Sequence, residues 1–154
     1  MVKGIYLKQG DDLSVPLAIR EEVFVREQGV PPEEEYDARD SLAVHALVYD
    51  EAGRPAGTAR LLLDEDGTFH IGRVAVLAAQ RHKGYGDFLV RMLLDRAFRC
   101  GAQEVHLGAQ LQAIPFYETI GFTVCGEEYL DAGIRHRPMR VRKGEVKTAC
   151  GHCH

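Results

Sequence analysis

The stretch GRVAVLAAQRHKGYG, residues 72–86, decides the fold, because it joins an apolar strand to an amphipathic helix through a glycine turn. Residues 68–76 follow a turn at 64–67 and predict a strand, and residues 84–100 carry apolar side chains at helical spacing. The first N–H groups of such a helix have no carbonyl partners, and the helix dipole places about half a positive charge beside them. Gly84 and Gly86 allow close backbone approach, so the turn suits a pyrophosphate.

Three basic residues, Arg81, His82 and Lys83, add flexible positive charge to this turn. No Gly-Lys-Ser/Thr sequence closes it, so it is not a Walker loop, and its spacing is not that of a dinucleotide fold. The alternative interpretation is a turn that contains two glycines without binding an anion. The strand-to-helix setting favours the anion site.

The rest of the chain continues this alternation of strands and helices. Apolar patterning and turn residues predict strands over residues 2–7, 42–49, 56–63, 68–76, 104–109, 122–129 and 136–141, and helices over 14–28, 84–100 and 112–119. Sequential strands joined by tight turns predict an antiparallel meander over residues 42–76, followed by an α/β alternation. Pro138 lacks an N–H, which confines the last strand to an edge or a bulge.

Length and composition indicate an ordinary globular protein. The chain has 154 residues, of which 45% are hydrophobic and 27% charged, and its formal net charge is −4. We expect one domain over residues 1–142 and a polar, frayed tail over 143–154. The weak negative charge argues against nucleic acid as a partner, and no apolar run reaches the ~20 residues of a membrane helix. Without a secretory signal, we expect a cytoplasmic protein.

Four cysteines are present, and their spacing is not that of a disulfide framework. We expect Cys100 and Cys125 to be buried, inert thiols. The last residues, Cys150, His152, Cys153 and His154, fit both a haem-attachment string and a small zinc cluster. Adventitious metal binding by a frayed tail is the interpretation that we favour, and we predict no metal in the site itself.

Two motifs resemble the GNAT superfamily of N-acetyltransferases. The first is Arg81-x-x-Gly84-x-Gly86 after the strand at 72–76, and the second is AIPFYETIGF at residues 113–122, similar to the family pattern A-x-x-F-Y-x-x-x-G-F. Residues 23–31 and 131–136 resemble small bacterial members of the ElaA and YjcF type. The resemblance covers residues 2–142.

This sequence departs from the family pattern at two positions. Gln110 stands where many members have asparagine, and His70 stands near where several carry a glutamate. Because of these two differences, the resemblance identifies neither the acceptor substrate nor the general base.

The resemblance implies a mixed, mostly antiparallel sheet with helices on both faces, an α/β (α+β) fold in which two central strands splay to admit acyl-CoA. It implies acetyl-CoA as the acyl donor and a primary amine of a small molecule, or a peptide, as the acceptor. The residues that would contact the cofactor are Val74, Ala75, Val76, Arg81, His82, Lys83, Gly84, Tyr85, Gly86, Gln110, Phe116 and Tyr117.

Catalytic roles also follow from the resemblance. Tyr117 matches the family tyrosine that faces the sulfur and would protonate the departing thiolate, although a tyrosine here could equally be a core aromatic. His70 is the candidate base, against the alternative of a structural or exposed histidine. Glu27, His45 and His136 are candidate substrate-binding residues and compete with His70 for the role of base.

Other functions are compatible with the same residues. Residues 24–28 are reminiscent of acyl-homoserine lactone synthases, whose larger size argues against that assignment, and a non-enzymatic acyl-CoA sensor would share the fold. The acidic run at residues 33–35 either attracts a cationic amine or is a solvated loop, which we favour. A homodimer is also compatible with the sequence.

Overall fold

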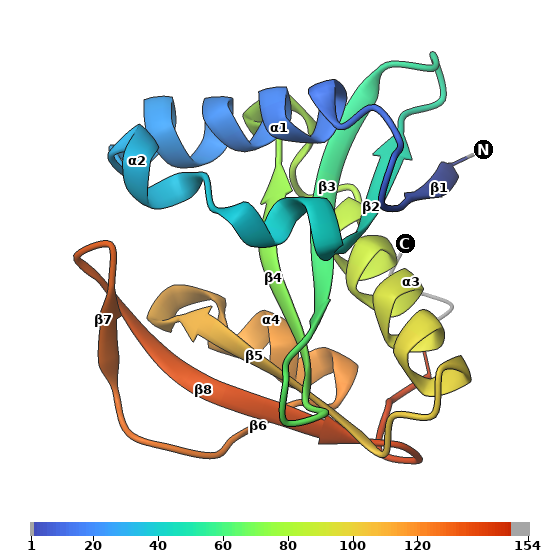
Figure 1. Cartoon of the computed structure of the whole chain (residues 1–154), viewed down its shortest axis with the longest axis vertical. Coiled ribbons are helices and arrows are strands. Elements are labelled where there is room, and N and C mark those ends of the chain that lie inside the picture. Colours follow the sequence, from blue (N-terminus) through green and yellow to red (C-terminus); the bar gives the residue numbers. More distant parts are fainter. Residues whose placement is uncertain (1, 149–154) are drawn as a thin grey trace.

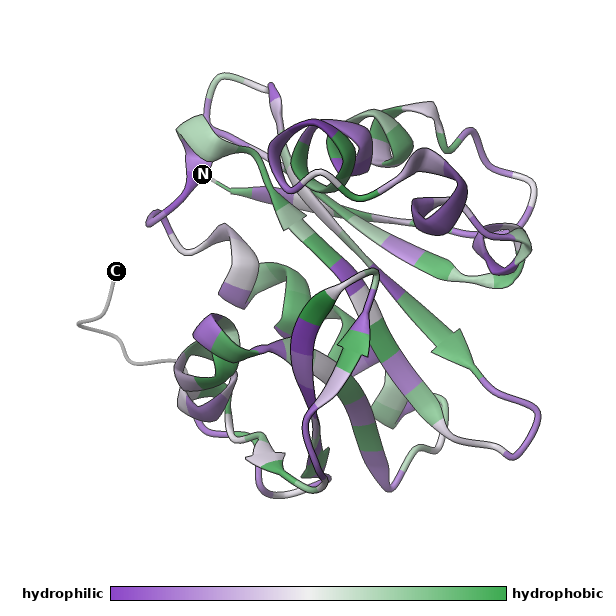
Figure 2. Ribbon diagram, turned by 90° about the vertical axis from the view of Figure 1, so that its left-hand side faces the viewer, coloured by the Kyte–Doolittle hydropathy of each residue, from purple (hydrophilic) through white to green (hydrophobic). Residues whose placement is uncertain are grey.

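The first half of the chain forms an antiparallel meander. The computed structural model describes residues 2–148, and its sheet begins with β1 (Lys3–Leu7), β2 (Val44–Tyr49), β3 (Pro55–Leu63) and β4 (Phe69–Val76). Each strand is antiparallel to the one before it, which confirms the predicted meander. The longer strands carry alternating bands of hydrophobic and hydrophilic residues, as expected of a sheet with two distinct faces (Figure 2).

Helices cover both faces of the sheet. On one face lies α1 (Ser14–Arg20), which continues into a π-helix, η1 (Glu21–Glu27), so the predicted helix at 14–28 has a widened second half. Short helices follow at α2 (Pro32–Glu35) and η2 (Ala38–Leu42). On the opposite face lie α3 (Tyr85–Arg99) and α4 (Ile114–Ile120), preceded by the 3₁₀ turns η3 (Ala78–Gln80) and η4 (Leu111–Ala113).

The hydrophobic core has one cluster on each face of the sheet. Ala46 and Val48 belong to the larger cluster with α3, whereas Leu47 packs with Ile19 and Val23 on the α1 side. Adjacent residues of β2 point to opposite faces, so this strand is buried from both sides. None of the helices within residues 2–148 has the length and apolar character needed to cross a membrane.

Two parallel strands part at the centre of the sheet. The strand β5 (Glu104–Gln110) pairs with β4 at Phe69↔Val105, His70↔His106 and Ile71↔Leu107. Both strands continue beyond this register, and the described residues form no further ladder between them. Figure 1 shows the sheet opening here, with α2 above and β7 below. The predicted splay of two central strands is confirmed.

The second half of the sheet corrects two sequence predictions. The strand expected over 122–129 is two strands, β6 (Thr123–Val124) and β7 (Tyr129–Asp131), and both pair with β8 (Ile134–Arg142). In addition, β8 is an inner strand rather than an edge, because β5 pairs with its other side. Pro138 is tolerated since its carbonyl bonds to Cys125, which directs its missing N–H into the break between β6 and β7.

Packing continues beyond the domain boundary expected at residue 142. Lys143 N–H donates to the Gln103 carbonyl at 2.8 Å and Lys147 N–H to the Ile120 carbonyl at 2.8 Å. Val146 packs against the larger core cluster. Residues 143–148 therefore lie on the domain instead of fraying from it, while the cysteine- and histidine-containing string at 150–154 lies outside the described residues.

The two internal cysteines are exposed, contrary to the expectation of buried thiols. Cys100 caps the C-terminus of α3, and Cys125 follows the short strand β6. Both positions lie at the end of an element, where the helical or strand pattern that suggested burial no longer applies.

A buried ionic network fastens α2 and η2 to α1, and no local sequence pattern predicts it. Arg20 is 1% exposed, and its guanidinium lies 2.5 Å from the Glu35 carboxylate and 2.7 Å from the Asp40 carboxylate. Glu35 is itself 2% exposed. The acidic run at 33–35 is therefore not a uniformly solvated loop, because its third residue is an internal counter-ion.

Two further arginines complete this network. Arg60 lies 2.8 Å from both Asp37 and Asp40, and Arg73 lies 2.7 Å from Glu35. Burial alone would raise the pKa of the Asp40 carboxyl, but hydrogen bonds and charge from Arg20 and Arg60 outweigh burial and hold that pKa below its usual value. Three guanidinium groups thus balance three carboxylates.

We predict that Glu35→Gln destabilises the protein by about 3–5 kcal/mol, because it leaves Arg20 buried without its full counter-charge. Glu33→Gln, on the exposed side of the same short helix, is the matched control and should change stability by less than about 0.5 kcal/mol. Urea denaturation measures both. Equal stability of the two variants would contradict a structural role for the network.

Candidate active site

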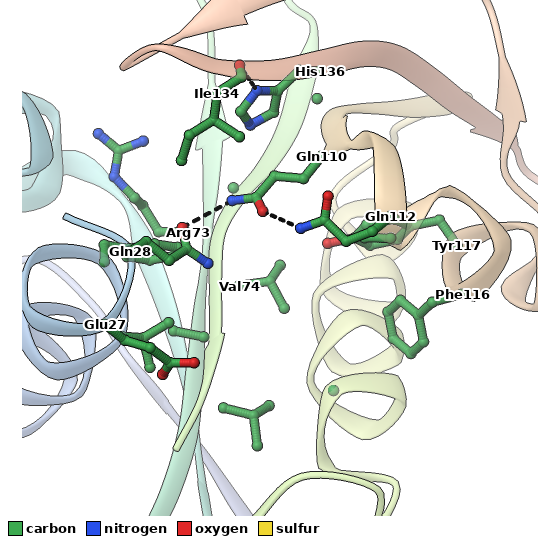
Figure 3. A pocket seen from close by; sticks show the side chains of 18 of the residues that line it. Glu27, Gln28, Arg73, Val74, Gln110, Gln112, Phe116, Tyr117, Ile134 and His136 are labelled. Atoms are coloured by element: carbon green, nitrogen blue, oxygen red, sulfur yellow. Dashed lines mark hydrogen bonds between the residues drawn. The ribbon is translucent and has the colours of Figure 1, made fainter. Parts of the chain in front are cut away.

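The opening between β4 and β5 is a cleft of about 850 Å³. Its walls come from the end of η1, from β4, from the head of α3, from β5 and α4, and from the β7–β8 hairpin. Figure 3 shows side chains from these elements converging on it. Because β5 leaves β4 after Ile71, the edge of β4 from residue 72 to 76 faces the cleft instead of a neighbouring strand.

The predicted anion turn forms one end of this cleft. Gly84 precedes α3 in the left-handed region at φ 87°, and His82 also has a positive φ of 63°. A Cβ on Gly86 would lie 3.4 Å from the Phe116 ring, so this glycine brings α3 close to α4. The backbone therefore bends at the head of a 15-residue helix, where unpaired N–H groups and the dipole favour an anion.

The side chain of Arg81 is occupied by protein partners, which differs from the prediction of free positive charge. Its guanidinium lies 2.5 and 2.6 Å from the two carboxylate oxygens of Glu27, and its Nε donates to the Val76 carbonyl at 3.0 Å. The hydrogen bonds from Arg81 lower the pKa of Glu27. Glu27 lines the cleft as predicted, but as a paired carboxylate that is a weak base.

The side chain of Lys83 has a hydrogen-bond partner within the protein, and the side chain of Tyr85 packs in the core. Lys83 Nζ donates to Gln80 Oε1 at 3.3 Å, and Gln80 in turn donates to Asp50 at 2.8 Å. Tyr85 is buried in the larger core cluster and also lines the cleft. The backbone of residues 81–86, rather than its cationic side chains, is therefore the candidate element for binding an anion.

A chain of three amides crosses the middle of the cleft. Gln112 Nε2 donates to Gln110 Oε1 at 2.5 Å, and Gln110 Nε2 donates to Gln28 Oε1 at 3.0 Å. In Figure 3 these amides lie between His136 on one side and Phe116 on the other. Gln110 was predicted at the site, and Gln28 was missed because 82 residues separate it from Gln110. Gln112 was also missed, although it is only two residues from Gln110.

Tyr117 lies in the cleft wall on α4, as predicted. Its ring contacts Phe116 and Phe122 edge-to-face, with centroid distances of 5.0 and 5.8 Å. The residue is 7% exposed, and burial raises the pKa of its hydroxyl. Among residues 2–148 no group hydrogen-bonds this hydroxyl, so it is a protonated donor without a protein partner.

A strained residue stands on β4 beside the cleft. Arg73 has φ 51°, and the β3–β4 register places both Arg73 and Val74 opposite Ala59. This is a β-bulge, and a left-handed non-glycine residue at such a point is typical of functional sites. The bulge ends where Val74, Ala75 and Val76 line the cleft.

The three candidate histidines fall in different places. His70 lies at the paired end of β4, outside the cleft, where Nδ1 contacts the Asp64 carboxylate and the ring contacts His106. His45 is fully buried outside the cleft and bonds the Asp40 carbonyl at 2.9 Å. His136 lines the cleft. The position of His70 before the parting of the strands removes it as a cleft base.

Comparisons with known proteins agree with this geometry. A family model described as "Acetyltransferase (GNAT) domain" matches residues 12–143. The uncharacterized N-acetyltransferase YjcF of Bacillus subtilis (strain 168) is 40% identical over 139 residues, covering 90% of this chain and 98% of that protein.

Solved structures with the same fold include ElaA of Escherichia coli and an acyl-CoA N-acyltransferase of Pseudomonas aeruginosa. ElaA superposes with a TM-score of 0.80 at 29% identity, over 92% of this chain and 100% of that one. The Pseudomonas structure gives a TM-score of 0.80 at 31% identity, over 92% and 99% of the two chains. With this family match and the parted strands beside a glycine turn, the chain belongs to the GNAT family and is an acetyltransferase.

Proposed function

We propose that the protein transfers the acetyl group of acetyl-CoA to a primary amine of a small molecule. The observation that carries this proposal is the meeting, in one cleft, of the unpaired edge of β4, the turn at Gly84 and the hydroxyl of Tyr117. Acetyl coenzyme A is bound in the crystal structure of a protein from Bacillus anthracis str. Ames that is described as a "putative streptothricin acetyltransferase" and shares this fold. The cleft volume is in the range of small-molecule sites.

The chain offers a contact for each part of the donor. N–H groups of residues 81–86 would bind the pyrophosphate, and the backbone of Val74 to Val76 would bind the pantetheine amides as an added strand does. A backbone N–H near Val76 would polarise the thioester carbonyl. Tyr117 would donate a proton to the departing sulfur, since its raised pKa keeps it protonated.

Turnover of acetyl-CoA with a panel of amino acids, polyamines, amino sugars and peptides tests the proposal. We expect acetylation of at least one small-molecule amine, detected as release of the free thiol. Turnover with peptides alone would contradict the small-molecule acceptor. Tight acetyl-CoA binding without turnover of any amine would favour the acyl-CoA sensor instead.

We predict that Gly84→Val weakens acetyl-CoA binding by at least tenfold in calorimetry, because valine disfavours φ 87° and reorients the N–H groups at the head of α3. Gly67→Val is the matched control, since Gly67 has φ 86° in a turn outside the cleft. Gly67→Val should lower the free energy of unfolding by about as much as Gly84→Val does, but it should keep the parental affinity for acetyl-CoA. Unchanged affinity of Gly84→Val would mean that the cofactor site is misplaced.

We predict that Tyr117→Phe lowers kcat by about 10²–10⁴-fold, the usual contribution of a general acid, while acetyl-CoA affinity changes little. The phenyl ring retains the edge contacts with Phe116 and Phe122. Steady-state kinetics and cofactor titration separate the two effects. A kcat within about threefold of the parent would remove Tyr117 as the acid.

A further inference from the structure

One histidine of the cleft has a tautomer that its own hydrogen bond fixes. His136 Nδ1 lies 2.7 Å from the backbone carbonyl oxygen of Ile134. A carbonyl accepts and cannot donate, so Nδ1 carries the hydrogen, and Nε2 of the neutral ring carries the lone pair. No residue between 2 and 148 hydrogen-bonds Nε2, and the ring lines the cleft (Figure 3).

The His136 ring is held from a second side by Tyr129. The two rings stack with centroids 5.6 Å apart and an interplanar angle of 26°. The Tyr129 hydroxyl lies over Gly108, where a Cβ would be 1.9 Å from its oxygen. Glycine at this position therefore leaves the space that the Tyr129 side chain occupies over β5. His136 is 9% exposed, so its orientation is set by packing rather than by solvent.

His136 lies on the side of the cleft away from the proposed pyrophosphate site, where the acceptor amine would enter. Its partner in the β5–β8 ladder is Gln110, the central amide of the chain across the cleft. Phe116, whose ring would lie 3.4 Å from a Cβ at Gly86 in the proposed anion turn, is on the other side of that chain (Figure 3). A donor whose pyrophosphate occupies the turn thus leaves the His136 side open for the amine.

We propose that His136 is the general base of the transfer, an inference that rests on the proposed acetyl transfer. Nε2 takes one proton from the acceptor ammonium and frees the nitrogen lone pair. The C–N bond then forms at the thioester carbon, the C–S bond breaks, and Tyr117 gives its proton to the sulfur. Tyr117 regains the second amine proton, and His136 releases the first to water. One proton is released per turnover, with no change of oxidation state.

Other basic groups around the cleft are less suited to this step. Glu27 is paired with Arg81, and Glu35 is held by Arg20 and Arg73. Asp87 is paired with Arg91, His82 belongs to the proposed anion turn, and Glu34 and Asp131 are exposed.

The test compares His136→Asn with the parent, because asparagine retains an N–H that can reach the Ile134 carbonyl but offers no basic nitrogen. We expect kcat/KM to fall by about 10²–10⁴-fold, acetyl-CoA affinity to stay within twofold, and added imidazole to restore part of the rate. In a plot of kcat/KM against pH, the rise on the acid side should disappear in His136→Asn, because the group that must lose its proton there is gone. The charged or titratable groups beside His136 are Arg135 and Arg137 on β8 and Tyr129 and Asp131 on β7, and those elsewhere in the cleft include Glu34, Arg73 and Tyr117.

Arg135→Gln is the matched control, because Arg135 is exposed on the same strand and bonds Glu128 at 2.7 Å. It should keep the parental rate and pH profile. If the parent turns over an amine and His136→Asn has a kcat/KM within threefold of the parent, the base assignment is overturned and the proposed acetyl transfer stands. Loss of acetyl-CoA affinity in His136→Asn would also overturn it, in favour of a structural role. A parent without turnover of any amine would overturn both proposals.

Discussion

The three-residue ladder between β4 and β5 is the constraint on which the rest of the structure depends. Phe69 to Ile71 tie the two halves of the sheet together, and beyond them each strand follows its own half. A parallel pair buried on both faces would normally continue, because each unpaired N–H and C=O in a dry interior costs free energy. Here the freed edge lines a cleft, so its polar groups stay available to a ligand.

The two halves of the sheet stay apart because each wall of the cleft is held in place by other contacts. These contacts differ between the two walls. Above the cleft, Arg20, Arg60 and Arg73 bind the acidic segment at residues 35–40 to α1 and to the bulge of β4. Below it, β8 pairs along the whole of β5, and Tyr129 fills the space over Gly108. Rigid walls of this kind keep catalytic groups in place before the substrate arrives.

Local features of the fold could be predicted from the sequence, but contacts between distant segments could not. Gly84 lies where a strand turns into a helix, and the local pattern was enough to predict a tight turn there, which the structure forms with Gly84 at φ 87°. Arg81 was assigned to the phosphate, yet Glu27 neutralises it from 54 residues away. His70 and His136 both lie on strands, and only the register of the sheet shows which one reaches the cleft. Burial of Glu35 likewise follows from Arg20 and Arg73, which no local pattern connects to it.

The crystal structure of the protein with coenzyme A tests the central claim most directly, because that claim is spatial. The account predicts pyrophosphate oxygens within hydrogen-bonding distance of N–H groups in residues 81–86, and a pantetheine arm beside Val74 to Val76 in the opening between β4 and β5. Coenzyme A bound elsewhere, with this opening closed or filled by side chains, would contradict it.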